Sequence, residues 1–354
     1  MTNFTLVNSE LIKDIPIVFL TGSSRSGTTL LSNILNSHEN VISCPENGFM
    51  HTHISAYGRK KRFSEGQVRR FVKNLWVRKR FMKEVWALDE SKLEQQLQAS
   101  RDALSFSYAC KHIYNMFGKG KEAKAFVDKG PSYLRSTKRL DRVFGKPKYI
   151  VIVRDYRDRY VSLKKLKKYS PLKMIESRGF IWSVHQRRAL RLKTQSPDRT
   201  FVVRYEDLIS KPEEILKTMC DFLGLPFSTN MLNHDQHQSS TYGQDSQNKR
   251  KQHFKDSHSK SLTGIDASNM KKYADKLTFE EIGRLDYACS RIGKEFGYEV
   301  DPTGKRLNFF QKLSVKLKLL FAGFTKVPQR MFMATPLRFQ AFLINGMHKL
   351  VYSK

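Results

Sequence analysis

One segment near the amino terminus constrains the fold of this chain more than any other. Residues 15–31 contain a short apolar run at 15–20, then a loop of small and polar residues, and then a helix-like stretch. A buried strand that passes through a tight loop into a helix is the repeating unit of parallel α/β sheets. The loop amides and the positive end of such a helix point the same way, so the segment predicts a site for an anion.

The two glycines of this loop, Gly22 and Gly27, have the spacing of the Walker A motif, G-x-x-x-x-G-K-[ST]. Thr28 stands where that motif carries its lysine. A site without the lysine lacks the usual clamp on the β- and γ-phosphates, so an ordinary P-loop kinase or ATPase is disfavoured. The loop still suits a phosphate group. Taken alone, it is also compatible with a plain tight turn, because Gly, Ser and Thr favour turns.

The rest of the chain alternates between short apolar strands and helix-like stretches. The predicted strands span residues 15–20, 41–43, 125–127, 149–153 and 201–203. Runs that are apolar on both faces suit a sheet covered on both sides, and 40% hydrophobic residues are enough for a large core. We therefore predict an α/β fold, with a central parallel sheet flanked by helices. The four cysteines are far apart and lack a C-x-x-C pair, which indicates reduced core residues.

The composition changes along the chain predict its organisation. Residues 1–300 are expected to form one domain, with a helical insert at about 58–116 and a mobile polar loop at about 233–261. Residues 301–354 form a basic amphipathic extension, since the 53 residues after Asp301 contain ten Lys or Arg and no Asp or Glu. No apolar run approaches the roughly 18 residues needed to span a bilayer. We expect a cytoplasmic protein, or one peripheral to a membrane through this extension.

The charge balance indicates an anionic partner. The chain has 64 Lys and Arg against 33 Asp and Glu, a net charge of +31. Such an excess fits nucleic acid, a phosphorylated cofactor, an acidic glycan or a membrane surface. No RNA-binding motif supports a nucleic-acid binder, so that class is disfavoured.

A second candidate phosphate site follows the apolar strand at residues 149–153. Arg154 lies at the carboxyl end of that strand, where open α/β sheets bind their ligands. Ser162 follows about two helical turns later, and an arginine with a hydroxyl can grip a phosphate through charge-assisted hydrogen bonds. The alternative is an ion pair between Arg154 and Asp158, four residues on.

The two motifs together resemble the sulfotransferases that use 3′-phosphoadenosine-5′-phosphosulfate (PAPS). The first loop is similar to their 5′-phosphosulfate loop, in the version of the tyrosylprotein and bacterial-type branch, and the pair Arg154 and Ser162 resembles their 3′-phosphate motif. The loop residues implied to bind PAPS are Arg25, Ser26, Gly27, Thr28 and Thr29. The resemblance covers about residues 14–300 and implies a P-loop-like sulfotransferase fold.

Two further residues match the family less specifically. Lys129, in V-D-K-G-P, resembles the lysine that approaches the transferring sulfuryl group, although a surface turn lysine is the alternative. With Arg25, it is implied to hold the charge that develops during transfer, so no metal ion is demanded. Tyr205, in V-R-Y-E-D-L, resembles the tyrosine near the adenosine, although a plain helix start is as consistent with the residues. The polar loop is expected to add a contact to the 3′-phosphate.

Sulfuryl transfer to a hydroxyl or amine needs a base that accepts the acceptor's proton. Glu46 lies 21 residues after Arg25, an interval similar to that of the catalytic glutamate in tyrosylprotein sulfotransferases. The alternative for Glu46 is an acidic residue at a helix start. His51 and His53 are the next candidate bases, and His38 is interpreted as structural. We predict Glu46 as the base.

These observations predict a PAPS-dependent sulfotransferase. The excess of positive charge favours a carbohydrate as the acceptor, and the resemblance leaves protein tyrosine open. The competing functions are a P-loop kinase with an atypical loop and a non-enzymatic binder of nucleic acid or anionic membrane. The sequence gives no indication of the oligomeric state.

Overall fold

The structure is a computed structural model of the 354-residue chain. It describes residues 11–46, 48–76, 82–83, 86–165, 174–235 and 269–324. The chain divides into two compact units. The sheet unit comprises Ile15–Glu46 and Gly120–Ala322, and the helical unit is built mainly from the described residues between Asn47 and Lys119.

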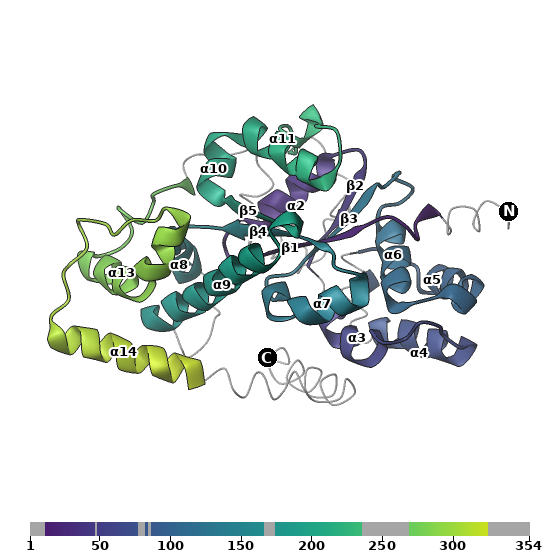
Figure 1. The fold of residues 1–354 in the computed structure, drawn as a ribbon, viewed down its shortest axis with the longest axis horizontal. Helices are drawn as coiled ribbons and strands as arrows, with labels where there is room; N and C mark the ends of the chain where they lie inside the picture. The colour runs from purple at the N-terminus through teal and green to yellow at the C-terminus, as the bar shows by residue number, and fades with distance from the viewer. Residues whose placement is uncertain are drawn as a thin grey trace, which may run out of the picture. The chain divides into compact units, whose positions relative to one another are not determined.

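Five parallel strands form the centre of the sheet unit, in the order β2-β3-β1-β4-β5 (Figure 1). Their bounds are β1 (Ile17–Gly22), β2 (Val41–Cys44), β3 (Ala125–Lys129), β4 (Lys148–Val153) and β5 (Thr200–Arg204). Every residue of β1, β2 and β3 is buried, and so is every residue of β4 except the first. Burial on both faces explains why these strands appear in the sequence as continuous apolar runs.

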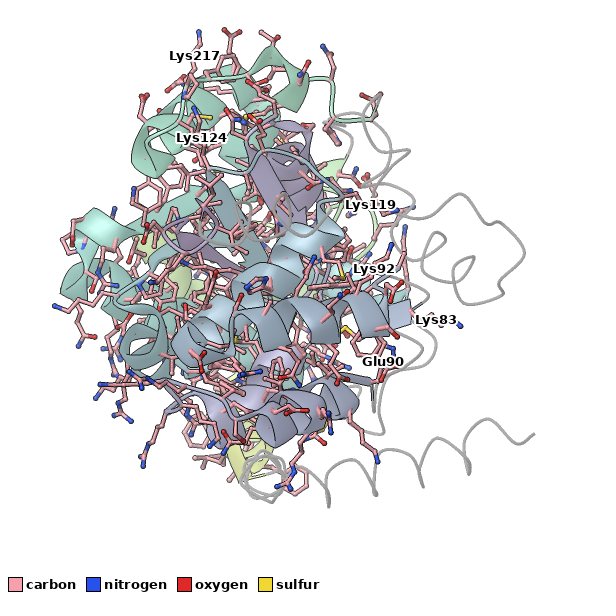
Figure 2. All side chains as sticks on the ribbon, turned by 90° about the vertical axis from the view of Figure 1, so that its right-hand side faces the viewer. Lys83, Glu90, Lys92, Lys119, Lys124 and Lys217 are labelled. Atoms are coloured by element: carbon pink, nitrogen blue, oxygen red, sulfur yellow. The ribbon has the colours of Figure 1, made fainter. Side chains whose placement is uncertain are left out.

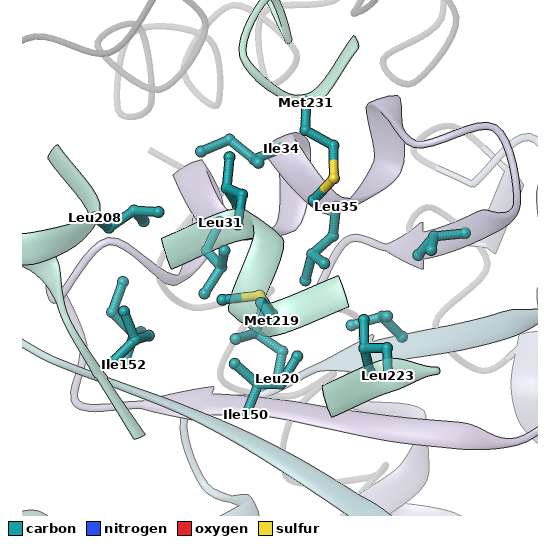
Figure 3. Close-up of a cluster of buried hydrophobic side chains, with 14 of the residues drawn as sticks. Leu20, Leu31, Ile34, Leu35, Ile150, Ile152, Leu208, Met219, Leu223 and Met231 are labelled. Atoms are coloured by element: carbon teal, nitrogen blue, oxygen red, sulfur yellow. The ribbon is translucent and has the colours of Figure 1, made fainter. Parts of the chain in front are cut away.

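Alternate residues of the central strands face different layers of the sheet unit. One face packs on α2 (Thr28–Ser37), α10 (Tyr205–Ser210) and α11 (Pro212–Leu223) (Figure 1). Figure 3 shows this core, in which the sheet supplies Leu20, Ile150 and Ile152 and the helices supply Leu31, Ile34, Leu208, Met219 and Leu223. Phe19 points to the other face, where its ring centroid lies 5.0 Å from that of Tyr133 and 5.2 Å from that of Phe144.

The second layer of helices completes the predicted architecture. α7 (Thr137–Phe144) and α9 (Ile175–Gln195) lie on the side of the sheet away from α2 and α11 (Figure 1). α13 (Phe279–Gly293) packs against α8 (Tyr156–Lys164) and α9. The prediction of a parallel sheet flanked by helices is therefore confirmed.

The strand order determines where a ligand site is expected. β1 lies at the centre, between β3 and β4. The chain leaves β1 toward β2 on one side and leaves β4 toward β5 on the other side. The loops after β1 and β4 therefore flank a topological switch point, which is where open α/β sheets bind ligands.

Four helices make up most of the helical unit. They are α3 (Phe49–Tyr57), α4 (Glu65–Leu75), α5 (Glu90–Ala99) and α6 (Phe106–Phe117). The side chains of Ser64, Asp89 and Ser105 cap the last three of these helices. The helices thus begin at Phe49, ahead of the helical insert predicted from residue 58.

Apolar and charged residues of the helical unit separate between its core and its surface. An aromatic cluster fills the core, with the ring centroid of Phe71 5.0 Å from that of Tyr57 and 5.8 Å from that of Phe63. The side chains of Lys83 and Lys92 are exposed and extend outward in Figure 2. Basic residues such as these two lysines therefore lie on the solvated surface of the helical unit, and its apolar residues hold the helices together.

The sheet unit continues past residue 300. The Tyr273 hydroxyl donates to Asp301 over 2.6 Å, and the Lys305 N–H donates to the Phe279 carbonyl over 2.8 Å. α14 (Phe309–Phe324) follows. The predicted domain boundary at residue 300 stays a prediction. Residues 236–261 of the predicted polar loop and residues 325–354 of the extension lie outside the described residues.

The cysteines lie in the core of the described structure. All four cysteines are buried and free, as predicted. Within the described ranges, no helix is long and apolar enough to cross a membrane. The same part of the chain contains no cluster of three His, Cys, Asp or Glu residues that could hold a metal ion.

Candidate active site

The loop after β1 is built from residues that allow a close approach of the backbone. A Cβ atom at Gly22 would lie 2.5 Å from the Ile152 carbonyl oxygen, so only glycine fits there. The Ser26 N–H donates to the Ser23 carbonyl over 3.1 Å, and the two serine hydroxyls lie 2.6 Å apart. No described side chain caps the N-terminus of α2, which follows Gly27. The amides of the first turn can therefore donate to an anion.

Gly27 is a sensitive point of this loop. Its φ angle is 96°, and an added Cβ would lie 2.5 Å from Cδ2 of Tyr205. We expect Gly27→Ala to lower the free energy of unfolding by about 1–3 kcal/mol, from the unfavourable φ and from displacement of the tyrosine. Gly224→Ala is the control, since Gly224 has φ 78° and open space around its Cα. If chemical denaturation shows the same loss of unfolding free energy in both variants, the contact with Tyr205 contributes nothing to the effect at Gly27.

Arg154 lies in the loop after β4, and contacts on several sides hold it in place. The indole N–H of Trp182 donates to the backbone carbonyl of Arg154 over 2.9 Å. Its guanidinium lies 4.1 Å from the ring centroid of Tyr205 and donates through Nη2 to the Asn269 carbonyl over 2.5 Å. Its Nε is buried and has no hydrogen-bond partner among the described residues. An unsatisfied buried donor on a fixed cation is suited to an anionic ligand.

The first loop brings a second guanidinium to the same place. Arg154 Nη1 lies 3.5 Å from the Arg25 carbonyl oxygen, so the loops after β1 and β4 meet. Burial and the positive charge of Arg154 both lower the pKa of Arg25. Arg25 also adopts φ 71°, which is an uncommon backbone conformation for a residue with a side chain. Arg25, on a strained loop, and Arg154, on the loop after β4, are mutually repelling cations. They define an electropositive site, in which a bound anion would relieve the repulsion.

A lysine from another strand supplies the charge that the first loop lacks at Thr28. Lys129, at the end of β3, is buried, and its Nζ donates to the Thr29 hydroxyl in the first turn of α2 over 3.1 Å. Burial lowers the pKa of Lys129 to about 8, although the Glu46 and Asp128 carboxylates act in the opposite direction. Lys129 is therefore a core residue at the phosphate loop, and the interpretation as a surface turn lysine is wrong.

Arg159 is a structural part of the site that sequence reasoning missed. It is 2% exposed, and its Nε donates to the Ser24 carbonyl in the first loop over 2.9 Å. Its Nη1 donates to the Arg178 carbonyl on α9 over 3.2 Å. Burial lowers the pKa of Arg159 to about 10, which leaves it charged at neutral pH. Arg159 thus fixes the loop after β1 to α8 and α9.

Arg157 and the acids around it support the loop after β4. Arg157 Nη2 lies 2.7 Å from Asp155, and its Nη1 lies 3.5 Å from Asp286 on α13. The Glu206 carboxylate accepts from the Asp155 N–H over 3.0 Å and from the Tyr298 hydroxyl over 2.7 Å. These ion pairs hold the backbone next to Arg154. The dense R-D-Y-R-D-R run directly after a strand is the signal in the sequence that could have indicated such a network.

Two predicted histidines have packing roles. His38 is fully buried; its Nδ1 accepts from the Asn40 N–H over 3.0 Å, and its Nε2 lies 2.9 Å from the Pro226 carbonyl. A ring with both nitrogens engaged supports the structural interpretation of His38. His53 is buried in the helical unit, where its Nδ1 lies 2.9 Å from the Phe49 carbonyl.

The remaining candidates lie on the sheet unit. Ser162 is a buried residue of α8, and Glu46 follows β2 with an exposed side chain. Asp158, the alternative partner of Arg154, accepts from the Tyr273 N–H over 3.0 Å, and burial raises the pKa of Asp158 to about 6. The contribution of Ser162 to a phosphate site stays a prediction.

The geometry gathers most of the predicted donor-binding residues. Direct contacts connect the first loop, Lys129, Arg154 and Tyr205, which lie at the carboxyl ends of β1, β3, β4 and β5. Three cationic side chains and an open helix end at one edge of a sheet can bind a ligand with more than one phosphate or sulfate group.

Comparison with known proteins identifies a matching family and a similar fold. A sequence model of the sulfotransferase family matches residues 16–229, which is more than half of the chain. The described fold is similar to a solved sulfotransferase domain from the Synechococcus PCC 7002 olefin synthase, with a TM-score of 0.54 at 24% identity. That alignment covers 81% of this chain and 96% of the solved one.

Curated relatives include animal enzymes. The chain is 28% identical over 235 residues to protein-tyrosine sulfotransferase 1 of Danio rerio, and 27% identical over 236 residues to that of Homo sapiens. Each alignment covers 63% of this chain, and they cover 57% and 55% of the relatives. The chain thus spans little more than half the length of these relatives.

The extent of the family match, together with the two loops that meet at the switch point, identifies the class of protein. The chain belongs to the sulfotransferase family. Its match includes the first loop, Glu46, Lys129, Arg154 and Tyr205. The family disfavours the two competing functions, a P-loop kinase and a non-enzymatic binder.

Proposed function

We propose that this protein transfers a sulfuryl group from PAPS to the hydroxyl of an acceptor. The observation that carries the proposal is the meeting of Arg25 and Arg154 from two βα loops of one sheet, in a chain of the sulfotransferase family. PAPS carries a phosphosulfate at its 5′ end and a phosphate at its 3′ end. Two separate cationic loops suit two separate anionic groups.

Each loop is assigned one end of the donor. The first loop and the open end of α2 would hold the 5′-phosphosulfate through Arg25, backbone amides and the Thr28 and Thr29 hydroxyls. Arg154 would hold the 3′-phosphate, with Ser162 as its predicted companion. Tyr205 lies between the two sites, against Gly27 and under Arg154, where its ring suits the adenosine.

The transfer step is an in-line displacement. The acceptor oxygen forms a bond to sulfur as the bond from sulfur to the leaving phosphate oxygen breaks. Glu46 is proposed to take the acceptor's proton, and Lys129 and Arg25 to hold the charge that moves onto the leaving phosphate. The electrostatic coupling of Glu46 to Lys129 supports placing both at one reaction centre. The proposal requires no metal ion, because these fixed cations can carry out the charge stabilisation.

The acceptor is the open part of the proposal. The names of the curated relatives favour a tyrosine hydroxyl in a protein, and we propose this acceptor as the first to test. The carbohydrate acceptor predicted from the excess of positive charge stays a prediction, and so does the cytoplasmic location.

A direct assay separates these acceptors. The purified protein would be incubated with PAPS and either a tyrosine-containing peptide, the same peptide with phenylalanine, or an acidic oligosaccharide. Mass spectrometry should detect one added sulfuryl group on the tyrosine peptide alone. Modification of the oligosaccharide alone would establish the carbohydrate acceptor. No modification of any acceptor, with PAPS bound, would contradict both assignments.

Arg154 gives a prediction about donor recognition. Arg154→Ala should remove a charge-assisted contact worth about 1.5–3 kcal/mol, or roughly ten- to a hundredfold in affinity. The loss should be larger for adenosine 3′,5′-bisphosphate than for adenosine 5′-phosphate, because only the former carries the 3′-phosphate. Calorimetry of both ligands checks this. Lys138→Ala, which removes an exposed cation on α7, should leave both affinities unchanged. Equal losses for both ligands would show that Arg154 does not read the 3′-phosphate.

A further inference from the structure

α14 presents a row of apolar side chains to solvent. Phe309, Phe310, Leu317 and Leu320 are each more than half exposed, with 73%, 78%, 58% and 62% of their surface accessible. With Leu313 and Phe321, they form what we call the apolar stripe. These six positions fall within roughly a third of the helix circumference, because their spacing follows the helical repeat. Soluble proteins rarely expose a contiguous apolar surface of this kind without a partner for it.

The stripe belongs to a helix that is fixed to the sheet unit by its other side. Val315 is 1% exposed, and Leu307, just before the helix, is 7% exposed. Lys318 Nζ lies 3.5 Å from Glu176, a buried residue of α9 that also accepts from Arg284 over 3.1 Å. α14 thus packs one face on the protein and displays the other, and the stripe is a fixed surface.

The charges beside the stripe indicate what it binds. Lys312 and Lys316 are exposed and lie along one edge of the stripe by helical position. The sequence from Pro302 to Lys354 contains ten Lys or Arg and no Asp or Glu. An apolar face with cations along one edge and no acidic residue on its helix complements an anionic lipid surface, which offers acyl chains below a layer of negative charge. A second copy of the chain would instead oppose these lysines with the same charges.

We propose that α14 docks in the plane of an anionic phospholipid membrane, with the apolar stripe inserted among the lipids and Lys312 and Lys316 at the headgroups. The helix lies on the surface, since no described helix is long and apolar enough to span a bilayer. The function of this contact would be to hold the enzyme at the membrane. It is independent of which acceptor the active site uses.

Vesicle sedimentation tests this proposal on the whole 354-residue chain. The unmodified protein should sediment with phosphatidylcholine vesicles that contain phosphatidylserine, should stay in solution with pure phosphatidylcholine, and should be released by high salt. Leu317→Glu should weaken vesicle binding at least about tenfold, because it places a charge in the apolar layer. Val300→Glu is the matched control, since it replaces an exposed aliphatic residue outside the stripe, and it should bind as the unmodified protein does.

Three further measurements keep the outcomes distinct. Thermal unfolding should be the same for both variants, and if Leu317→Glu fails to fold, Leu317→Gln replaces it. Lys312→Ala with Lys316→Ala should lose about tenfold or more in binding to the anionic vesicles alone. Light scattering without vesicles should give the same mass for Leu317→Glu as for the unmodified protein.

Several results would overturn the proposal. These are binding that does not depend on phosphatidylserine, absence of binding to either vesicle, and an equal loss in Val300→Glu. A dimer that dissociates in Leu317→Glu without lipid would show instead that a second copy of the chain covers the stripe.

Discussion

Replacing Glu46 with Gln should lower turnover about 10²–10⁴-fold, because the amide keeps the shape of the side chain and cannot accept a proton. Binding of adenosine 3′,5′-bisphosphate should stay nearly unchanged, since Glu46 is not assigned a contact with the nucleotide. Steady-state kinetics with PAPS and calorimetry with the desulfated nucleotide separate the two effects. Glu122→Gln, a change at an exposed glutamate before β3, is the control and should retain full turnover.

Normal turnover in Glu46→Gln would contradict the assignment of the base. The alternatives would then be His51 and His53 in the same assay. His53 is buried among the aromatic rings of the helical unit, and its Nδ1 faces a backbone carbonyl, which is an unsuitable setting for a base that meets an acceptor. The side chain of His51 lies outside the described residues.

Lys129→Ala should have the second large effect. Removing a fixed donor to charge that develops in the transition state typically costs about 10²–10³-fold in kcat. We expect this loss at neutral pH, with a smaller change in the affinity for adenosine 3′,5′-bisphosphate. Lys124→Ala is the matched control, since Lys124 precedes the same strand with an exposed side chain (Figure 2). A kcat within a few-fold of the unmodified protein would remove Lys129 from the transfer step.

The pKa of Lys129 gives this assignment a second readout. An amine is charged below its pKa, so activity that needs the ammonium should be present at pH 7 and fall as pH rises through about 8. The fall should appear in kcat/KM, which reports the free enzyme. In Glu46→Gln the residual activity should fall at a lower pH, because the carboxylate that raises the pKa of Lys129 is gone. A flat profile from pH 7 to 10 would contradict a charged Lys129 in the reaction.

The sheet could be predicted from the sequence because β1, β2, β3 and β4 are buried on both faces. All five apolar runs correspond to strands, and the first is displaced by two residues, from 15–20 to Ile17–Gly22. The strand begins after Pro16, which has no N–H to donate to the sheet, and it extends to Gly22 because Thr21 and Gly22 still pair with β4. The two phosphate loops were identifiable because small residues and an arginine directly follow apolar strands.

Long-range contacts could not be predicted from the sequence in the same way. Arg159 and Ser24 are 135 positions apart in the chain, and Arg154 reaches Asn269 over 115 positions. The sequence of either segment alone does not show that the two segments lie next to each other in the fold. The burial of Lys129 is another example, since a lysine at the end of a short strand is usually exposed, and here it ends β3, on which α2 packs.

Calorimetric titration of the unmodified protein with adenosine 3′,5′-bisphosphate and with ATP tests whether this site is built for PAPS. We expect the bisphosphate to bind at least about tenfold more tightly than ATP, because Arg154 is proposed to bind a 3′-phosphate that ATP lacks and Thr28 replaces the lysine that clamps a triphosphate. Equal affinities, or tighter binding of ATP, would contradict a site built for PAPS.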